Sequence, residues 1–139
     1  MLKRTLVVFA LLLASLAAVA AGKEPLTHET MWLMKRVGSP SISPDGKWVV
    51  FSVTEPAYDE KEQRTDLWLV PADGSAPPRK ITALKAGESD PSWSPDGSQI
   101  AFTTNRTGNS EIFVMSSTGT HLFNVTQHSG TDAMPAWSR

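Results

Sequence analysis

One short turn sequence, Ser-Pro-Asp-Gly, occurs twice in the chain, at residues 43–46 and 94–97. Proline fixes the backbone of the first turn position, aspartate accepts hydrogen bonds from backbone amides further along, and glycine adopts a positive φ without steric cost. Apolar residues come after both turns, in Trp48–Phe51 and in Gln99–Phe102, where Ile100 and Phe102 alternate. Both stretches therefore predict β-hairpins, and their repetition predicts a repeated fold.

The repetition extends beyond the hairpins. Each is followed by a third apolar strand, a glycine turn and a fourth strand, and the hairpin begins a third time at Asp132. The two Asp-Gly turns lie 51 residues apart, and Ser94 and Ser138 lie 44 apart. A four-stranded unit that recurs every 40 to 50 residues is typical of β-propeller blades.

The third strands support this interpretation because they are apolar on both faces, as in Leu67–Val70 and Ile112–Met115. Such a strand fits a sheet that packs between two neighbouring sheets. We therefore predict an all-β fold, a partial β-propeller of about two and a half four-stranded blades. The expected limits are a repeat region over 39–139, with blades at about 39–83 and 90–127 and a third blade begun at 132.

The N-terminus predicts export. Lys3 and Arg4 precede an apolar run from Leu6 to Val19, and Ala18-Val19-Ala20 has the small residues of a signal-peptidase site. The run is shorter than the roughly 20 residues that a membrane-spanning helix needs. We predict a signal peptide over residues 1–20, and the absence of cysteine excludes a lipoprotein anchor. Together with the lack of disulfides, this favours a protein of the bacterial periplasm or a secreted one.

Residues 21–38 predict a leader and a short helix. The helix is expected over Leu26–Arg36, with Thr27 as its N-cap, Glu29 in the first turn, and Lys35 and Arg36 in the last. Such a helix is too short to be stable alone, so its apolar side chains are expected to pack on the part of the chain that comes after it.

The charge balance and the polar residues point to no catalytic, cofactor-binding or metal site. Without Lys3 and Arg4, 14 acidic and 11 basic side chains remain, which excludes a basic surface for nucleic acid. No Gly-x-Ser-x-Gly nucleophile elbow occurs, and Gly108-Asn109-Ser110, the nearest match, is predicted to form a hairpin tip. The histidines His28, His121 and His128 have no metal-ligand spacing. The carboxylates Asp59, Glu60 and Glu62 alternate with cations. The aspartates Asp45 and Asp96 belong to the Pro-Asp-Gly turns.

The long connection over residues 55–64 has two interpretations: a solvated hairpin loop, or a binding loop on one rim of the assembly. The tryptophans Trp48, Trp68, Trp93 and Trp137 fall at strand positions and are expected in the core.

These residues carry a resemblance. The Trp93–Gly97 hairpin with its Ile-Ala-Phe strand, and the Glu111–Met115 strand, resemble the WD-like propeller repeat of TolB. The same repeat forms the N-terminal propeller of exported prolyl oligopeptidase family serine peptidases, the dipeptidyl and acylaminoacyl peptidases. The run Trp32–Pro40 before Ile42–Gly46, and the strand Asp66–Val70, are similar to the start of those peptidases.

The resemblance implies one of two functions. As part of a peptidase, the chain would be a non-catalytic propeller segment that restricts access to short peptides. Hydrolysis, and any contact with a peptide substrate, would then belong to a C-terminal α/β-hydrolase domain that carries the catalytic triad. Alternatively, the chain is similar to TolB as a periplasmic module that binds proteins. In both cases the partial ring predicts a truncated piece of a larger product, or completion by a protein partner or by self-association through exposed blade edges. No cofactor, no nucleic acid and, after signal cleavage, no membrane contact is expected.

Overall fold

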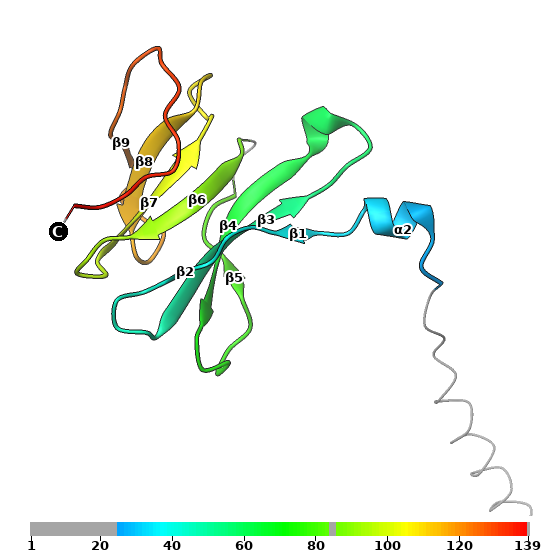
Figure 1. The fold of residues 1–139 in the computed structure, drawn as a ribbon, viewed down its shortest axis with the longest axis horizontal. Helices are drawn as coiled ribbons and strands as arrows, with labels where there is room; N and C mark the ends of the chain where they lie inside the picture. The colour runs from blue at the N-terminus through cyan, green and yellow to red at the C-terminus, as the bar shows by residue number, and fades with distance from the viewer. Residues whose placement is uncertain (1–24, 84–85, 139) are drawn as a thin grey trace, which may run out of the picture. The chain divides into compact units, whose positions relative to one another are not determined.

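The structure is a computed structural model that describes residues 25–83 and 86–138 (Figure 1). The predicted signal peptide over residues 1–20 lies outside the described residues. The chain divides into one unit that ends at Met31 and a second unit, from Trp32 onward, that contains both β-sheets.

The helix is shorter than its sequence predicts. It spans His28–Trp32 (α2), and the Thr27 hydroxyl caps it by accepting a hydrogen bond from the Thr30 amide at 3.1 Å. Lys35 lies beyond the helix, where its ammonium contacts the Glu55 carboxylate at 2.6 Å, so the predicted basic last turn is wrong.

The apolar side chains at this point of the chain are also not packed as expected: they remain exposed at Met31, Trp32, Leu33 and Met34. Within the described residues, we find no helix of the length and apolarity needed to cross a membrane.

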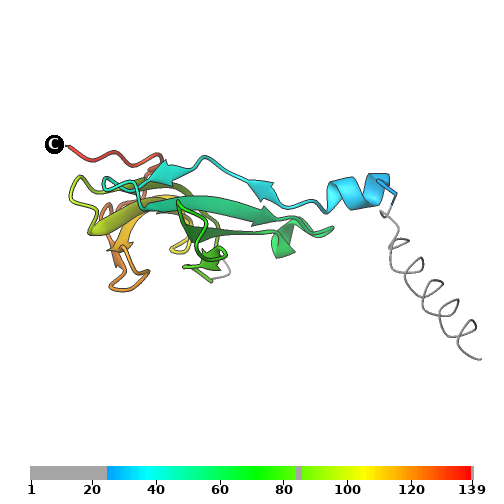
Figure 2. The same ribbon diagram turned by 90° about the horizontal axis from the view of Figure 1, so that it is seen from below.

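The first sheet, which we call blade 1, is an antiparallel meander whose first strand, at one edge of the sheet, is split in two. The interruption falls between the two short first strands, where the Gly38 amide donates to the Ser52 carbonyl at 2.8 Å. The next pair is long and continuously paired, from Trp48 opposite Pro71 to Glu55 opposite Arg64. The strands are β1 (Arg36–Val37), β2 (Ser41–Ile42), β3 (Trp48–Glu55), β4 (Arg64–Pro71) and β5 (Arg79–Lys80), and a short 3-10 helix η1 (Glu60–Glu62) joins β3 to β4 (Figure 2).

The second sheet, blade 2, repeats this order as β6 (Glu88–Trp93), β7 (Gln99–Thr104), β8 (Glu111–Ser116) and β9 (Phe123–Asn124). Its first strand is continuous but bulges between Ser89 and Ser92, at the repeat position where blade 1 is split. Asp90 has a positive φ of 52° in this bulge, and Met134, 44 residues later, has 54°. Two antiparallel sheets in sequence, one of five strands because its first strand is split and one of four, confirm the predicted partial propeller.

The two Pro-Asp-Gly turns adopt the same geometry. Gly46 and Gly97 have φ of 71° and 72°, the left-handed region that glycine enters without a Cβ clash. In the second turn the Asp96 carboxylate accepts hydrogen bonds from the Ser94 hydroxyl at 2.6 Å and from the Ser98 amide at 3.0 Å. The Ser94 hydroxyl oxygen in turn accepts a hydrogen bond from the Gln99 amide, so side chains as well as the backbone hold the hairpin turn together.

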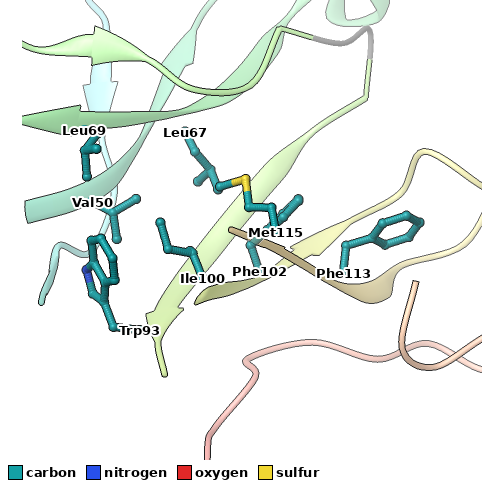
Figure 3. Packing of buried hydrophobic residues seen from close by; sticks show 8 residues of the cluster. All are labelled: Val50, Leu67, Leu69, Trp93, Ile100, Phe102, Phe113 and Met115. Atoms are coloured by element: carbon teal, nitrogen blue, oxygen red, sulfur yellow. The ribbon is translucent and has the colours of Figure 1, made fainter. Parts of the chain in front are cut away.

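The core lies between the two blades (Figure 3). It joins side chains from the middle strands of blade 1 to side chains from the first three strands of blade 2. The Phe102 and Phe113 rings meet in a tilted arrangement with centroids 6.4 Å apart. Its buried members are Val50, Leu67 and Leu69 from blade 1 and Trp93, Ile100, Phe102, Phe113 and Met115 from blade 2.

Trp93 links the first strands of the two blades. Its ring is 8% exposed, and its indole N–H donates to the Ser41 carbonyl at 3.1 Å. Trp137 makes the same bond one repeat later, to the Ser92 carbonyl at 3.1 Å. Trp48 is 37% exposed, which corrects its predicted place in the core: it begins β3 at the rim of the sheet.

We expect Trp93→Phe to lower the free energy of unfolding by about 1 to 3 kcal/mol, because it removes the hydrogen bond to Ser41 and part of a buried ring. Urea unfolding followed by circular dichroism measures the change. Trp32→Phe, at a side chain that is 52% exposed, is the matched control and should stay within about 0.5 kcal/mol of the parent protein. Equal effects of the two substitutions would contradict the role of Trp93.

Candidate functional site

The aspartates of the two Pro-Asp-Gly turns accept hydrogen bonds from residues of the same turns. The Ser94 hydroxyl, more than the Ser98 amide and hydroxyl, lowers the pKa of Asp96 to about 2. The hydroxyl of Ser43 and the amide of Lys47 likewise lower the pKa of Asp45. Carboxylates whose pKa is lowered in this way remain ionised and are poor general bases near neutral pH. The structure therefore gives both residues a role in turn closure.

The segment nearest in sequence to a nucleophile elbow lies in the hairpin connection between β7 and β8, as predicted. Within it the Asn109 side-chain amide donates hydrogen bonds to the carbonyl oxygens of His128, at 2.9 Å, and Gly130. These bonds attach the hairpin tip to the segment after β9.

The histidines and the acidic run are dispersed. His128 pairs with Asp132, Nε2 to Oδ2 at 2.9 Å, whereas His28 is exposed on α2. The Asp59 carboxylate caps η1 by accepting the Lys61 amide at 2.9 Å. Among residues 25–83 and 86–138, no group of three or more His, Asp or Glu side chains could hold a metal ion.

A cavity of about 330 Å³ lies where the Asp-Gly turns of the two blades meet. Asp45 and Asp96 stand on its wall, and Arg79 supplies a cation. Because both carboxylates are already hydrogen-bonded in their turns, the cavity offers few uncommitted polar atoms. Its lining is Ser43, Asp45, Trp48, Leu69, Arg79, Trp93, Asp96, Gly97, Ser117 and Thr118.

Blade 2 has an apolar outer face, on the side of its sheet opposite the core. Strand pairing places Val114 opposite both Ala101 and Phe123, so the three share this face. A hollow of about 350 Å³ opens on it, and the C-terminal segment with Trp137 forms one wall. We call this surface the outer face of blade 2; it comprises Ala101, Ile112, Val114, Phe123 and Val125.

Blade 1 also has an apolar outer face. Val50, Leu67 and Leu69 point into the core, and their neighbours along the strands therefore point the other way. The register pairs Val49 with Val70 and Phe51 with Trp68 on this side. All four side chains are only half-buried, and together they define the outer face of blade 1.

Sequence reasoning missed a buried acid between the blades. Glu88, the first residue of β6, is fully buried, and the Arg106 guanidinium contacts its carboxylate at 3.1 Å. The Thr82 hydroxyl from the end of blade 1 donates to the other carboxylate oxygen at 3.1 Å. Arg106 itself lies over the Phe113 ring, 4.7 Å from its centroid. One carboxylate thus connects both blades.

Burial raises the pKa of Glu88 to about 7, although the Thr82 hydroxyl and the Arg106 charge both act to lower it. The repeat carried a signal that could have identified this residue, because Glu88 and Asp132 each precede a Trp by five positions. Asp132 begins the third copy and donates its backbone amide to the Ser110 carbonyl at 2.8 Å.

We expect Glu88 to make the stability depend on pH. Its folded-state pKa lies above the ordinary 4.5, so the folded state binds more protons than the unfolded state between these values. The stabilising contribution of the protonated acid is complete below about pH 4.5 and is lost as the pH rises through about 7. Urea titrations at pH 5, 6, 7 and 8 should show a steeper fall for the parent protein than for Glu88→Gln; parallel curves would contradict this assignment.

The fold and the site together define a class: a β-propeller module built of antiparallel four-stranded blades, whose polar residues serve turns and blade contacts. The match to a protein-family model agrees, because the TolB beta propeller domain model matches residues 27–139. The chain belongs to this TolB-type propeller family.

Among curated proteins, the chain is similar to dipeptidyl-peptidase 5. It is 35% identical over 89 residues to the protein of Porphyromonas gingivalis, which covers 64% of this chain and 13% of that protein. It is 33% identical over 105 residues to the protein of Porphyromonas endodontalis, which covers 76% of this chain and 15% of that protein. The chain therefore spans about one seventh of the length of these relatives.

Among solved structures, the chain is similar to TolB from Acinetobacter baumannii, with a TM-score of 0.54 and 29% identity. The likeness covers 70% of this chain and 23% of that one. This chain is thus related both to the propellers of peptidases and to TolB.

Proposed function

We propose that this chain is the non-catalytic propeller segment of an exported serine peptidase, in which the propeller limits access to the active site. The observation that carries the proposal is the 35% identity to a dipeptidyl-peptidase of which this segment covers 13%. Peptide hydrolysis would belong to an α/β-hydrolase domain elsewhere in such a protein, and the substrates would be short peptides from which dipeptides are released.

The described residues suit this passive role. The two acids of the Pro-Asp-Gly turns are held in hydrogen bonds, and Glu88 is buried against Arg106 between the blades. Such a segment supplies a stiff wall for a substrate entrance, since its polar groups hold the blades together instead of facing a reactant. The predicted signal peptide and the relationship to Porphyromonas dipeptidyl-peptidases and TolB support export to the periplasm or beyond.

The first test is direct. We expect the purified 139-residue chain to release no chromophore from dipeptide nitroanilides above an enzyme-free blank, because the nucleophile belongs to another domain. Turnover that co-purifies with the chain and is abolished by a serine-directed inhibitor would contradict the assignment.

The access role needs the protein that the complete reading frame encodes. If that frame adds a hydrolase domain with a Gly-x-Ser-x-Gly elbow, Trp93→Phe should loosen the blade contact and raise kcat/KM for a peptide of about 20 residues relative to a dipeptide nitroanilide. Trp32→Phe is the control and should leave the ratio unchanged. An unchanged ratio in both variants, with Trp93→Phe measurably destabilised, would reject gating by this part of the propeller.

A second candidate is a TolB-like periplasmic propeller that binds proteins. The exposed Phe123 and Val125 side chains, beside the hollow on the outer face of blade 2, favour it, because exposed apolar surface commonly marks an interaction site. The reading frame distinguishes the candidates: further blades before a stop codon would support the binding module, and a nucleophile elbow with Asp and His after it would support the peptidase.

A further inference from the structure

The cavity of about 330 Å³ between the two blades has a negatively charged end. The two Pro-Asp-Gly turns adjoin there, since a Cβ placed on Gly97 would lie 3.5 Å from the Pro44 ring. The Asp45 and Asp96 carboxylates line this end, and their lowered pKa values keep them ionised at neutral pH. Among the described residues, Asp45 Oδ2 has only the Lys47 ammonium as a partner, 3.8 Å away, so it can still accept a hydrogen bond.

The opposite end carries a cation that turn closure does not use. There the β8–β9 turn adjoins the end of blade 1, since a Cβ placed on Gly119 would lie 3.1 Å from the Ile81 carbonyl oxygen. Arg79 of β5 and the turn residues Ser117 and Thr118 line the cavity at this end. Within residues 25–83 and 86–138, the Arg79 guanidinium forms no hydrogen bond and no ion pair. A guanidinium presents a planar fork of donors that matches a carboxylate, so this end suits an anion.

Apolar side chains separate the two charged ends. The middle strands of blade 1, β3 and β4, contribute Trp48 and Leu69 to the cavity. Trp93 of blade 2 lines it from the other side, and its ring points toward blade 1 (Figure 3). Trp48 is 37% exposed, so part of its indole is open to a ligand. The cavity is therefore an apolar slot with an anionic end and a cationic end.

The strand spacing indicates how far apart the charged ends are. β5 lies two strands from β3, and the turn before β3 carries Asp45. Neighbouring strands lie about 4.8 Å apart, so the two ends are separated by roughly 10 Å. An extended dipeptide spans about 7 Å, and hydrogen bonds of about 3 Å at its two termini let it reach both ends. The volume of about 330 Å³ is at the small end of the range for ligand sites, which also fits a dipeptide.

We propose that this cavity binds a free dipeptide with an apolar side chain. The α-ammonium group contacts the turn carboxylates, the C-terminal carboxylate contacts Arg79, and the apolar side chain lies between Trp48 and Trp93. This site goes beyond the proposed function, because binding needs only the two blades of this chain and involves no hydrolysis. Further blades on the outer faces would leave the site intact, because the cavity lies between blades 1 and 2.

Titration calorimetry of the 139-residue chain with the dipeptide Ala-Phe tests the site. Near-UV circular dichroism and a cooperative urea transition first establish that the chain is folded. We expect saturable one-to-one binding with a Kd below about 1 mM, accompanied by a change in tryptophan fluorescence. Ala-Phe amide lacks the carboxylate and N-acetyl-Ala-Phe lacks the ammonium group. Each should bind at least about tenfold more weakly, because each loses a charged hydrogen bond.

Arg79→Gln identifies the group that holds the carboxylate. This variant should bind Ala-Phe at least about tenfold more weakly than the parent protein. Amidation of the dipeptide should then cause no further loss, because both changes remove the same contact. Arg64→Gln is the matched control: this exposed arginine begins β4 outside the cavity lining, and the variant should bind both peptides like the parent protein. Arg79→Met takes the place of Arg79→Gln if that variant does not fold.

Several results would overturn the proposal. The folded parent protein could show no saturation by about 10 mM Ala-Phe, or Ala-Phe amide could bind as tightly as the free dipeptide. Arg79→Gln could bind like the parent protein, or amidation could weaken binding to this variant as much as to the parent. Equal binding of N-acetyl-Ala-Phe would reject the contact with the turn carboxylates and, with it, the assignment of a free dipeptide.

Discussion

The contact between the two sheets is the constraint on which the rest of the structure depends. A four-stranded sheet with apolar side chains on both faces cannot stay exposed in water, and here each blade buries one of its faces on the other. Trp93 fixes the geometry of that contact, because its ring fills the interface while its indole N–H reaches the Ser41 carbonyl. The hydrophobic effect is not directional, so the hydrogen bond from Trp93 and the contacts of the Glu88 carboxylate specify how the two sheets align.

Much of this architecture could be predicted from the sequence, because its determinants are local. The Pro-Asp-Gly turns fix the hairpins, and the apolar third strands identify sheets covered on both sides. The α2 helix was less predictable: its periodic apolar residues continue past Trp32, but the backbone becomes extended so that Arg36 can pair with Thr54 in blade 1. Long-range strand pairing there overrides local helix preference.

The buried acid shows a different limit. Glu88 is held by Arg106, 18 positions later, and by Thr82 in the other blade, so no window of helix or strand periodicity contains the whole cluster. Only the recurrence of an acid five residues before Trp93 and before Trp137 hinted at it. Function is limited in a similar way. The repeat predicts the propeller fold, but propellers of this kind have many different functions, so the fold alone does not predict the activity.

The long β3–β4 hairpin carries a consequence for how such a protein can diversify. Its pairing continues without a break to Glu55 and Arg64, beyond the core side chains of both strands, and η1 closes it (Figure 2). The stretch between Phe102 and Glu111 in blade 2 is six residues shorter than the corresponding stretch between Phe51 and Asp66, yet the repeat positions of the two blades still match. The extra residues at this tip leave the register of the repeat positions unchanged, and closing a longer loop costs little entropy. Selection can therefore vary this tip in length and charge while the propeller around it keeps its shape.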